Sequence, residues 1–369
     1  MNWLKNVGTK YFMPTDATGP RTNNFNVIRI IAAAMVIYGH MSSLMGLPVH
    51  GVYGQSVSTL AVKILFIVSG YLVMKSLMSD SHFGRYMLRR SFRIFPGLIG
   101  VVLFAVFIVG PVFTRLPLSE YFASAGTWEY LRNILLYPVY ALPGVFEGYT
   151  YPNAVNGSLW TMPVEFALYL ALPVLLWIFK KLRITRLGLL IVTVALAVIN
   201  YMHISYNPTA RFVVYGTNWY DTFGIIPYFF AGSLFALPGM NKLFNLQTAT
   251  LLMALTAIFR FSSVKCEFIL CFVLPYFVLS FALVERPVFS HWFEKCDFSY
   301  GLYLYGFVVQ QIVSHQLQKL NNPLFSLNVT FVICFALTFV CAVISWYVIE
   351  KPMQTLGKKI VSRSLKASA

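Results

Sequence analysis

Charged residues are scarce in this chain. Asp, Glu, Lys and Arg make up 11% of its 369 residues, and only 12 residues are acidic. Soluble globular domains are usually about 25% charged. Here 58% of the residues are hydrophobic and the mean hydropathy is +0.69, which indicates a polytopic membrane protein. The apolar runs are continuous and do not alternate with polar residues. They exclude a membrane barrel and predict an all-α integral membrane protein.

Cysteine is also scarce, and no metal-site pattern is present. None of the five cysteines has metal-ligand spacing with a histidine, so we expect buried small residues and no metal. The first two dozen residues lack the apolar core and cleavage site of a signal peptide. Without a repeat or a low-complexity linker, the chain is predicted to form one transmembrane domain, residues 25–352. A cytoplasmic N-terminal segment, 1–24, precedes it, and a basic cytoplasmic tail, 353–369, follows it.

Ten apolar segments are predicted to be membrane helices. They lie near residues 25–44, 57–78, 96–114, 159–179, 187–203, 221–237, 247–261, 266–284, 299–316 and 329–348. With the N-terminus inside, most Lys and Arg residues fall in inner loops, as the positive-inside rule requires. We therefore expect both termini in the cytoplasm. The net charge of +16 is then explained by loops held at the membrane, without nucleic acid as a partner.

The first apolar segment contains two ionisable residues, Arg29 and His40. A helical turn of about 100° per residue places them on nearly the same face, roughly 16 Å apart along the axis. Ionisable groups at membrane depth usually face a protein interior or a wet cavity. His40 is the candidate general base, because imidazole exchanges a proton near neutral pH. Arg29 either binds an anionic or carbonyl group or extends to the lipid headgroups.

A cluster of arginines follows the second predicted span. Arg89 and Arg93 are four residues apart and share a helix face, with Arg90 beside them. Guanidinium groups match phosphate oxygens, so the cluster is a candidate phosphate site; the alternative is an anchor on anionic lipid.

The stretch from Asn156 to Glu165 combines polar residues with a carboxylate that enters the membrane. Ser158 and Glu165 are seven residues apart, which is two helical turns. Glu165 needs a partner, and Arg29, Lys63 and His40 are the candidates. It either orients His40 or the acceptor, or forms a structural ion pair. Asn156, Ser158 and Trp160 are the predicted substrate-binding residues.

Taken together, these stretches resemble the membrane-bound acyltransferase 3 family. The resemblance is carried, in family order, by Arg29 and His40, LFIVSGYLV at 65–73, RRSFRIFP at 89–96, GSLWTMPVEF at 157–166, SYGLYLYG at 299–306 and SWYVIEKP at 345–352. It covers nearly the whole chain. One departure is Gly306, where many members of the family have a histidine.

The resemblance implies about ten membrane helices and transfer of an acyl group, most often acetyl, from cytoplasmic acyl-CoA. The implied acceptor is a hydroxyl of a bacterial cell-envelope polysaccharide or its lipid-linked precursor. It implies catalytic roles for His40 and Arg29, with Glu165, and places Arg89, Arg90 and Arg93 on the acetyl-CoA donor. The expected location is the bacterial inner membrane, in contact with lipid. The expected state is a homo-oligomer or a chain that works with a separate extracytoplasmic partner.

Two other functions fit the same residues. A transporter or flippase for a glycan or an organic anion would use the buried charges as a pathway. A scaffold of an envelope-synthesis complex would leave Arg29 and His40 unexplained. We expect the O-acyltransferase, because a histidine base, a fixed cation for a developing oxyanion and a phosphate-binding cluster suit that chemistry.

Overall fold

The computed structural model describes residues 23–49, 51–261, 263–284, 296–319 and 326–367. The predicted N-terminal segment lies outside these ranges except for its last two residues. The described part is helical, and its strands form two small antiparallel hairpins. Their bounds are β1 (Gly51–Val52) with β2 (Gln55–Ser56), and β3 (Val213–Val214) with β4 (Thr217–Asn218).

Nine long helices carry most of the described chain. They are α2 (Phe25–Leu44), α3 (Val57–Ser79), α4 (Phe83–Phe104), α8 (Thr161–Lys181), α9 (Thr185–Tyr206), α13 (Ser263–Ala282), α14 (Ser299–Lys319), α15 (Leu327–Ser345) and α16 (Lys351–Ala367). The shorter ones are α5 (Gly110–Phe113), α6 (Leu118–Ala123), α7 (Ala125–Glu129), α10 (Trp219–Phe223), α11 (Ile226–Phe235) and α12 (Leu246–Thr256). Short 3₁₀ helices lie at Tyr130–Leu135, Gly157–Trp160, Met240–Leu243 and Ala257–Phe261, and π turns at Ala105–Val109 and Trp346–Glu350.

Each of the ten predicted segments contains a helix, and six helical stretches of the described chain are long and apolar enough to cross a membrane. The six are Phe25–Leu44, Val57–Ser79, Phe83–Phe113, Gly157–Lys181, Thr185–Tyr206 and Leu327–Ser364. The fold is therefore that of an all-α, multi-pass membrane protein. The predicted segment 221–237 is broken between α10 and α11, where backbone turns replace a single long helix.

The third predicted segment starts too late, at residue 96. The helix begins at Phe83 and continues through a π turn to Phe113, so the arginine cluster lies in the first part of this helix, as the shared helix face of Arg89 and Arg93 required. The imidazole of His82 caps this helix by accepting a hydrogen bond from the Arg85 N–H at 3.3 Å. Residues beyond Lys351 likewise form α16, whose Gly357 packs on the Phe92 ring of α4.

Helix α3 is central, because glycines bring its neighbours within backbone contact. A Cβ atom on Gly39 of α2 would lie 2.3 Å from the Ser58 nitrogen of α3. A Cβ atom on Gly70 of α3 would lie 2.0 Å from the Phe229 carbonyl oxygen of α11. These contacts fix α2, α3 and α11 relative to one another.

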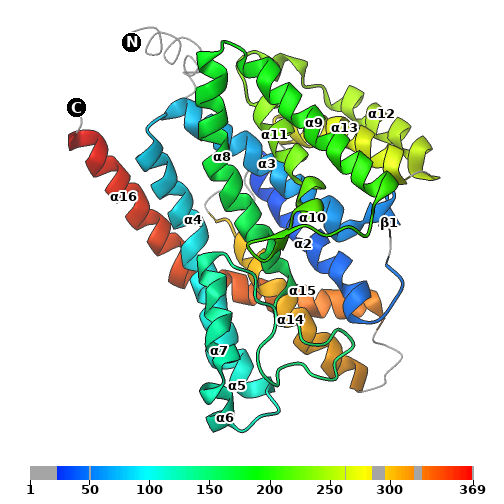
Figure 1. Cartoon of the computed structure of the whole chain (residues 1–369), viewed down its shortest axis with the longest axis vertical. Helices are drawn as coiled ribbons and strands as arrows, with labels where there is room; N and C mark the ends of the chain where they lie inside the picture. Colours follow the sequence, from blue (N-terminus) through cyan, green and yellow to red (C-terminus); the bar gives the residue numbers. More distant parts are fainter. Residues whose placement is uncertain (1–22, 50, 262, 285–295, 320–325, 368–369) are drawn as a thin grey trace.

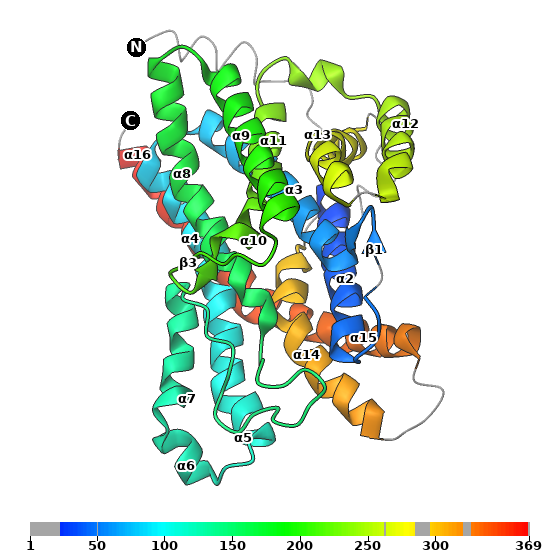
Figure 2. The same cartoon turned by 45° about the vertical axis from the view of Figure 1, so that its right-hand side comes forward.

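The remaining helices surround this centre (Figure 1). Helix α14 packs against α2 and α15, and the Gln310 side chain donates a hydrogen bond to the Ile37 carbonyl oxygen at 2.6 Å. Helices α8 and α9 lie on another side, while α5, α6 and α7 gather at one end of the molecule (Figure 2). The two ends of α2, marked by Arg29 and His40, define the two ends of the site.

Candidate active site

Three cavities follow one another from the Arg29 end of α2 to its His40 end. The arginine cavity, about 100 Å³, is lined by Arg29, Arg90 and Arg93, among other residues. The middle cavity, about 470 Å³, lies against Lys63 of α3. The loop cavity, about 700 Å³, is bounded by the loop segments around Tyr140 and Tyr151 and by β3 and β4. His40 lines both the middle and the loop cavities.

The arginine cavity combines cations with aromatic rings. The Arg93 guanidinium lies 5.5 Å from the centre of the Tyr300 ring, and that of Arg90 lies 5.7 Å from the centre of the Tyr169 ring. The Nε atoms of Arg29 and Arg90 are buried, and neither has a hydrogen-bond partner within the described residues. Buried N–H groups of this kind are costly unless a ligand or water accepts from them. The cavity can therefore receive an anion.

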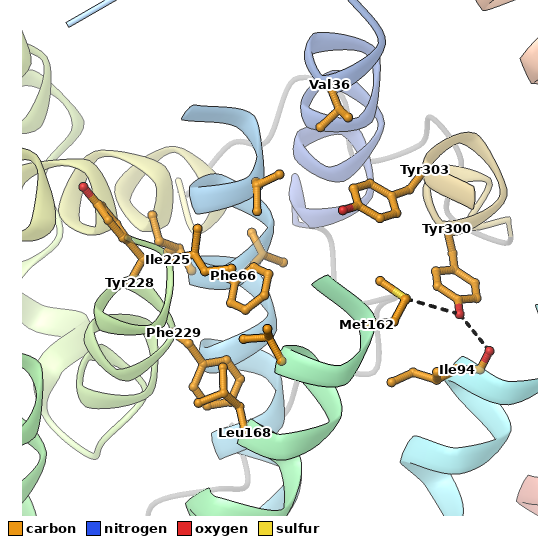
Figure 3. Packing of buried hydrophobic residues seen from close by; sticks show 14 of the residues in the cluster. Val36, Phe66, Ile94, Met162, Leu168, Ile225, Tyr228, Phe229, Tyr300 and Tyr303 are labelled. Atoms are coloured by element: carbon orange, nitrogen blue, oxygen red, sulfur yellow. Dashed lines mark hydrogen bonds between the residues drawn. The ribbon is translucent and has the colours of Figure 1, made fainter. Parts of the chain in front are cut away.

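Apolar and tyrosine side chains from three helices complete the walls of this cavity (Figure 3). Phe66 comes from α3, Met162 from α8, and Tyr300 and Tyr303 from α14. The Tyr300 hydroxyl donates a 2.7 Å hydrogen bond to the Ile94 carbonyl oxygen, which ties α14 to the arginine helix α4.

Asp297 holds two of the arginines together. Its Oδ2 accepts a hydrogen bond from Arg93 Nη2 at 2.6 Å and lies 3.2 Å from Arg29 Nη2. Asp297 precedes α14. Burial alone would raise the pKa of its carboxyl group, but the two guanidinium charges outweigh burial and hold it below its usual range. Asp297 was not among the residues predicted for the site. The signal available in the sequence was its position, because Asp297 is one of only 12 acidic residues and lies just before the tyrosine-rich stretch 299–306.

The predicted cluster of Arg89, Arg90 and Arg93 does not stay together. Arg89 donates to Asp80 at 2.9 Å, and Arg85 binds the same carboxylate through two bonds of 2.9 and 2.8 Å. Asp80 lies just before α4, so it reaches only the first turns of that helix. Arg90 and Arg93 line the cavity with Arg29, and Arg89 does not. The hydrogen bonds from Arg85 and Arg89 lower the pKa of Asp80 below its ordinary value.

Glu165 also lines the arginine cavity. Its carboxylate accepts hydrogen bonds from the Ser69 hydroxyl at 3.1 Å and from the Tyr169 hydroxyl. None of the three predicted partners binds it, and His40 lines the other two cavities. Arg29 binds Asp297 instead, and Lys63 pairs with Glu267.

His40 lies where the middle and loop cavities meet. Trp160 and Asp221 also line both cavities, so the three side chains surround the junction. The His40 ring makes an edge-to-face contact with Phe307, with a centroid distance of 5.5 Å and an angle of 75°. Its Nδ1 atom is buried without a hydrogen-bond partner in the described chain. The imidazole is therefore held by packing, and a ring nitrogen is left for a proton transfer.

A buried ion pair borders the middle cavity. Lys63 Nζ donates to Glu267 and to Gln55, and the Asn200 amide donates to Glu267 at 3.4 Å. Lys63 faces α13, whereas Glu165 is on α8; this difference explains why the two do not pair. Glu267 could not be assigned a role from the sequence, because its partner Lys63 is 204 residues away in the chain.

The predicted substrate-binding residues of the 156–160 stretch have different positions. The Asn156 amide donates to the Leu304 carbonyl oxygen at 2.8 Å, and its oxygen accepts from the Ser158 N–H at 3.1 Å. Asn156 and Ser158 are buried and line none of the three cavities. Asn156 thus holds the turn before α8, and Trp160 is the residue that reaches the cavities.

A multi-pass membrane protein with an arginine-lined cavity at one end and a histidine-lined cavity toward the other has features that suit acyl transfer. Comparison with known proteins agrees. Residues 22–347 match the acyltransferase domain model, and the chain belongs to this acyltransferase 3 family. No solved structure was found to match the chain.

Two curated relatives align over almost the whole chain. One is an O-acetyl transferase of Shigella phage Sf6, 27% identical over 339 residues, which cover 91% of this chain and 97% of the relative. The other is nodulation protein 10 of Rhizobium leguminosarum bv. viciae, 28% identical over 376 residues, which cover 94% of this chain and 97% of the relative.

Proposed function

We propose that this chain is an integral membrane O-acyltransferase of the bacterial inner membrane. It moves an acyl group, in the first instance acetyl, from cytoplasmic acyl-CoA to a sugar hydroxyl of a cell-envelope polysaccharide or its lipid-linked precursor. The family membership supports acyl transfer, and the relative named O-acetyl transferase supports an oxygen acceptor. The phosphates of the donor and the hydroxyl of the acceptor need different environments, which the two ends of the site provide.

The observation that carries the proposal is the separation of Arg29, Arg90 and Arg93 from His40 in adjoining cavities. The arginines take phosphate oxygens of the donor, for which guanidinium geometry is suited. At about 100 Å³, their cavity holds only a part of CoA, so the adenine end would extend beyond it. The distribution of basic loops supports a cytoplasmic arginine end, on the side of the proposed donor.

The separation also narrows the role of Arg29. Eleven helical residues place it about 16 Å along the axis from His40, so it cannot stabilise an oxyanion formed beside that histidine. In this proposal Arg29 binds the donor together with Arg90 and Arg93. Glu165, which shares their cavity, shapes the donor side and does not orient His40.

The reaction follows from the position of His40. A ring nitrogen accepts the proton of the sugar hydroxyl, and the oxygen attacks the thioester carbonyl carbon. A carbon–oxygen bond forms and the carbon–sulfur bond breaks. His40 then returns the proton to the departing CoA thiolate, so the products are the ester and CoA. Trp160, at the same junction, offers an aromatic face to the sugar ring.

The test is a transfer assay with labelled acetyl-CoA and purified protein, combined with mass spectrometry of surface polysaccharide from cells with and without the gene. We expect an added acyl mass that requires the gene and is lost with His40→Ala. The matched control is His315→Ala, because His315 stacks on Tyr149 at 3.4 Å and lines none of the three cavities. Full transfer by a folded His40→Ala protein would refute the base. Movement of a glycan without added mass would favour the transporter.

A further inference from the structure

The last helix, α16, has three faces of different character. Its backbone turns about 100° per residue, so residues three or four positions apart share a face. One face packs on α4: a Cβ atom on Gly357 would lie 2.7 Å from the Phe92 ring, and Val361 is buried. The second face is apolar and the third is basic, and both are exposed. Their members are Met353, Leu356 and Ile360 on the apolar face and Lys358, Lys359 and Arg363 on the basic face.

The basic face is not neutralised by nearby carboxylates. Helix α16 contains five Lys and Arg residues and no Asp or Glu. Within the part of the chain that the structure describes, Lys358, Lys359 and Arg363 form no ion pair. Cations gathered on one face attract anionic groups. The apolar face beside them has side chains that are 37–45% exposed, so it favours a partner that also offers apolar groups.

Helix α16 lies next to a membrane span and to the helix of the arginine cluster. It continues, through a π turn, the helical stretch Leu327–Ser364, which contains an apolar span. It then runs beside α4 (Figure 1). Phe92, its contact on α4, stands between Arg90 and Arg93 in the sequence, so α16 belongs to the arginine end of the molecule. The positive-inside rule supports a cytoplasmic position for this end, and the cytoplasmic leaflet carries anionic lipids.

We infer that α16 lies at the membrane surface and binds the headgroups of anionic phospholipids. The basic face contacts the headgroup phosphates, and the apolar face enters the boundary between headgroups and acyl chains, as in interfacial amphipathic helices. Through the packing of Gly357 on Phe92, the bound lipid holds α4, which carries Arg90 and Arg93. The inference concerns a partner of the protein and does not depend on the proposed reaction.

The experiment measures thermal unfolding of the purified full chain, stripped of lipid in detergent, with added phosphatidylglycerol or phosphatidylcholine. A lipid that binds the folded state raises the unfolding temperature. We expect the anionic phosphatidylglycerol to give the larger rise and added salt to reduce it, because salt screens exposed charges. The variant Lys358→Gln/Lys359→Gln/Arg363→Gln neutralises the basic face. Its apparent affinity for phosphatidylglycerol falls roughly a hundredfold, at about fivefold for each cation lost.

The matched control neutralises three exposed cations at the connection between α8 and α9, in Lys180→Gln/Lys181→Gln/Arg183→Gln. We expect this variant to keep the wild-type response to phosphatidylglycerol. A second variant, Leu356→Ser/Ile360→Ser, weakens the response without removing a charge, because the apolar face loses its contact with lipid. Native mass spectrometry of the lipid that stays bound during purification gives the same comparison for a variant of low stability.

Several results would overturn the inference. Equal responses of the wild type to the two lipids would show that the headgroup charge is not recognised. An equal loss in the control would assign the attraction to basic loops in general and not to α16. An equal rise with glycerol phosphate, which has no acyl chains, would indicate a site for a free anion. A changed oligomeric mass in Leu356→Ser/Ile360→Ser with an unchanged lipid response would assign the apolar face to a second copy of the chain.

Discussion

Replacing Asp297 with Asn tests whether the arginine cavity is an anion site. The carboxylate is the only contact that the described residues provide between the guanidinium groups of Arg29 and Arg93. Both Nη2 atoms contact the same oxygen, at 3.2 and 2.6 Å, so they lie at most about 6 Å apart. At an effective dielectric constant of about 20, two unit charges at this distance repel by about 3 kcal/mol.

The side chains of Arg29 and Arg93 are 20% and 23% exposed, so solvent screens part of this repulsion. Asp297→Asn removes the attraction that offsets this repulsion and leaves the two guanidinium charges unpaired, so we expect it to lower the free energy of unfolding by about 2–3 kcal/mol. CoA brings phosphate charge that replaces the lost carboxylate. Binding to the folded state alone stabilises it, so the shift in unfolding temperature caused by CoA becomes larger in the variant than in the wild type.

Asp80→Asn is the matched control in the same thermal unfolding assay in detergent. It breaks the ion pairs with Arg85 and Arg89, which lie outside the cavity. We expect this variant to lose stability without any change in the response to CoA. An equal CoA response in the two variants would refute the assignment of the arginine cavity to the donor, as would an Asp297→Asn protein as stable as the wild type.

Three further predictions follow from the described contacts. Arg90→Gln raises the KM for acetyl-CoA, whereas Arg89→Gln changes it little, because Arg90 lines the arginine cavity and Arg89 does not. Initial transfer rates measured against acetyl-CoA concentration give the KM of each variant. Glu165→Gln keeps kcat within about tenfold, whereas His40→Ala loses the roughly 10²–10⁴-fold contribution of a general base; a loss in Glu165→Gln as large as in His40→Ala would restore the predicted pair. The lowered pKa of Asp80 means that its ion pairs stabilise the protein above the ordinary carboxyl pKa of about 3.9 and are lost as the pH falls below it. The stability difference between the wild type and Asp80→Asn should thus be constant near neutral pH and shrink only in acid.

The sequence was informative where local chemistry decides the structure. Helix α2 begins and ends where the apolar run does, because a long apolar segment in lipid must satisfy its own backbone hydrogen bonds. Arg29 and His40 were prominent for a related reason: ionisable groups are rare in such a segment. The sequence also singled out Trp160 and the arginines of α4, although it did not show that Arg89 turns away from the others.

Long-range partners could not be predicted in this way. The partner of Arg93 is Asp297, 204 residues away, and the partner of Lys63 is Glu267, at the same separation. Which carboxylate meets which cation depends on how α2, α4, α13 and α14 pack, and periodicity within one helix contains no such information. Glu165 shows the consequence, because Arg29 and Lys63 contact other carboxylates, His40 lines other cavities, and the Glu165 carboxylate is left to hydroxyl groups.

One helix carries both Arg29 and His40, yet their side chains line different cavities. Arg29 lines the arginine cavity and His40 lines the middle cavity, so α2 links the two halves of the site as one element. The backbone contact at Gly39 and the bond from Gln310 to Ile37 fix the part of α2 next to His40. A base held in this way cannot move toward the donor. In the proposed reaction the donor must therefore extend to the base, about 16 Å along α2 from Arg29.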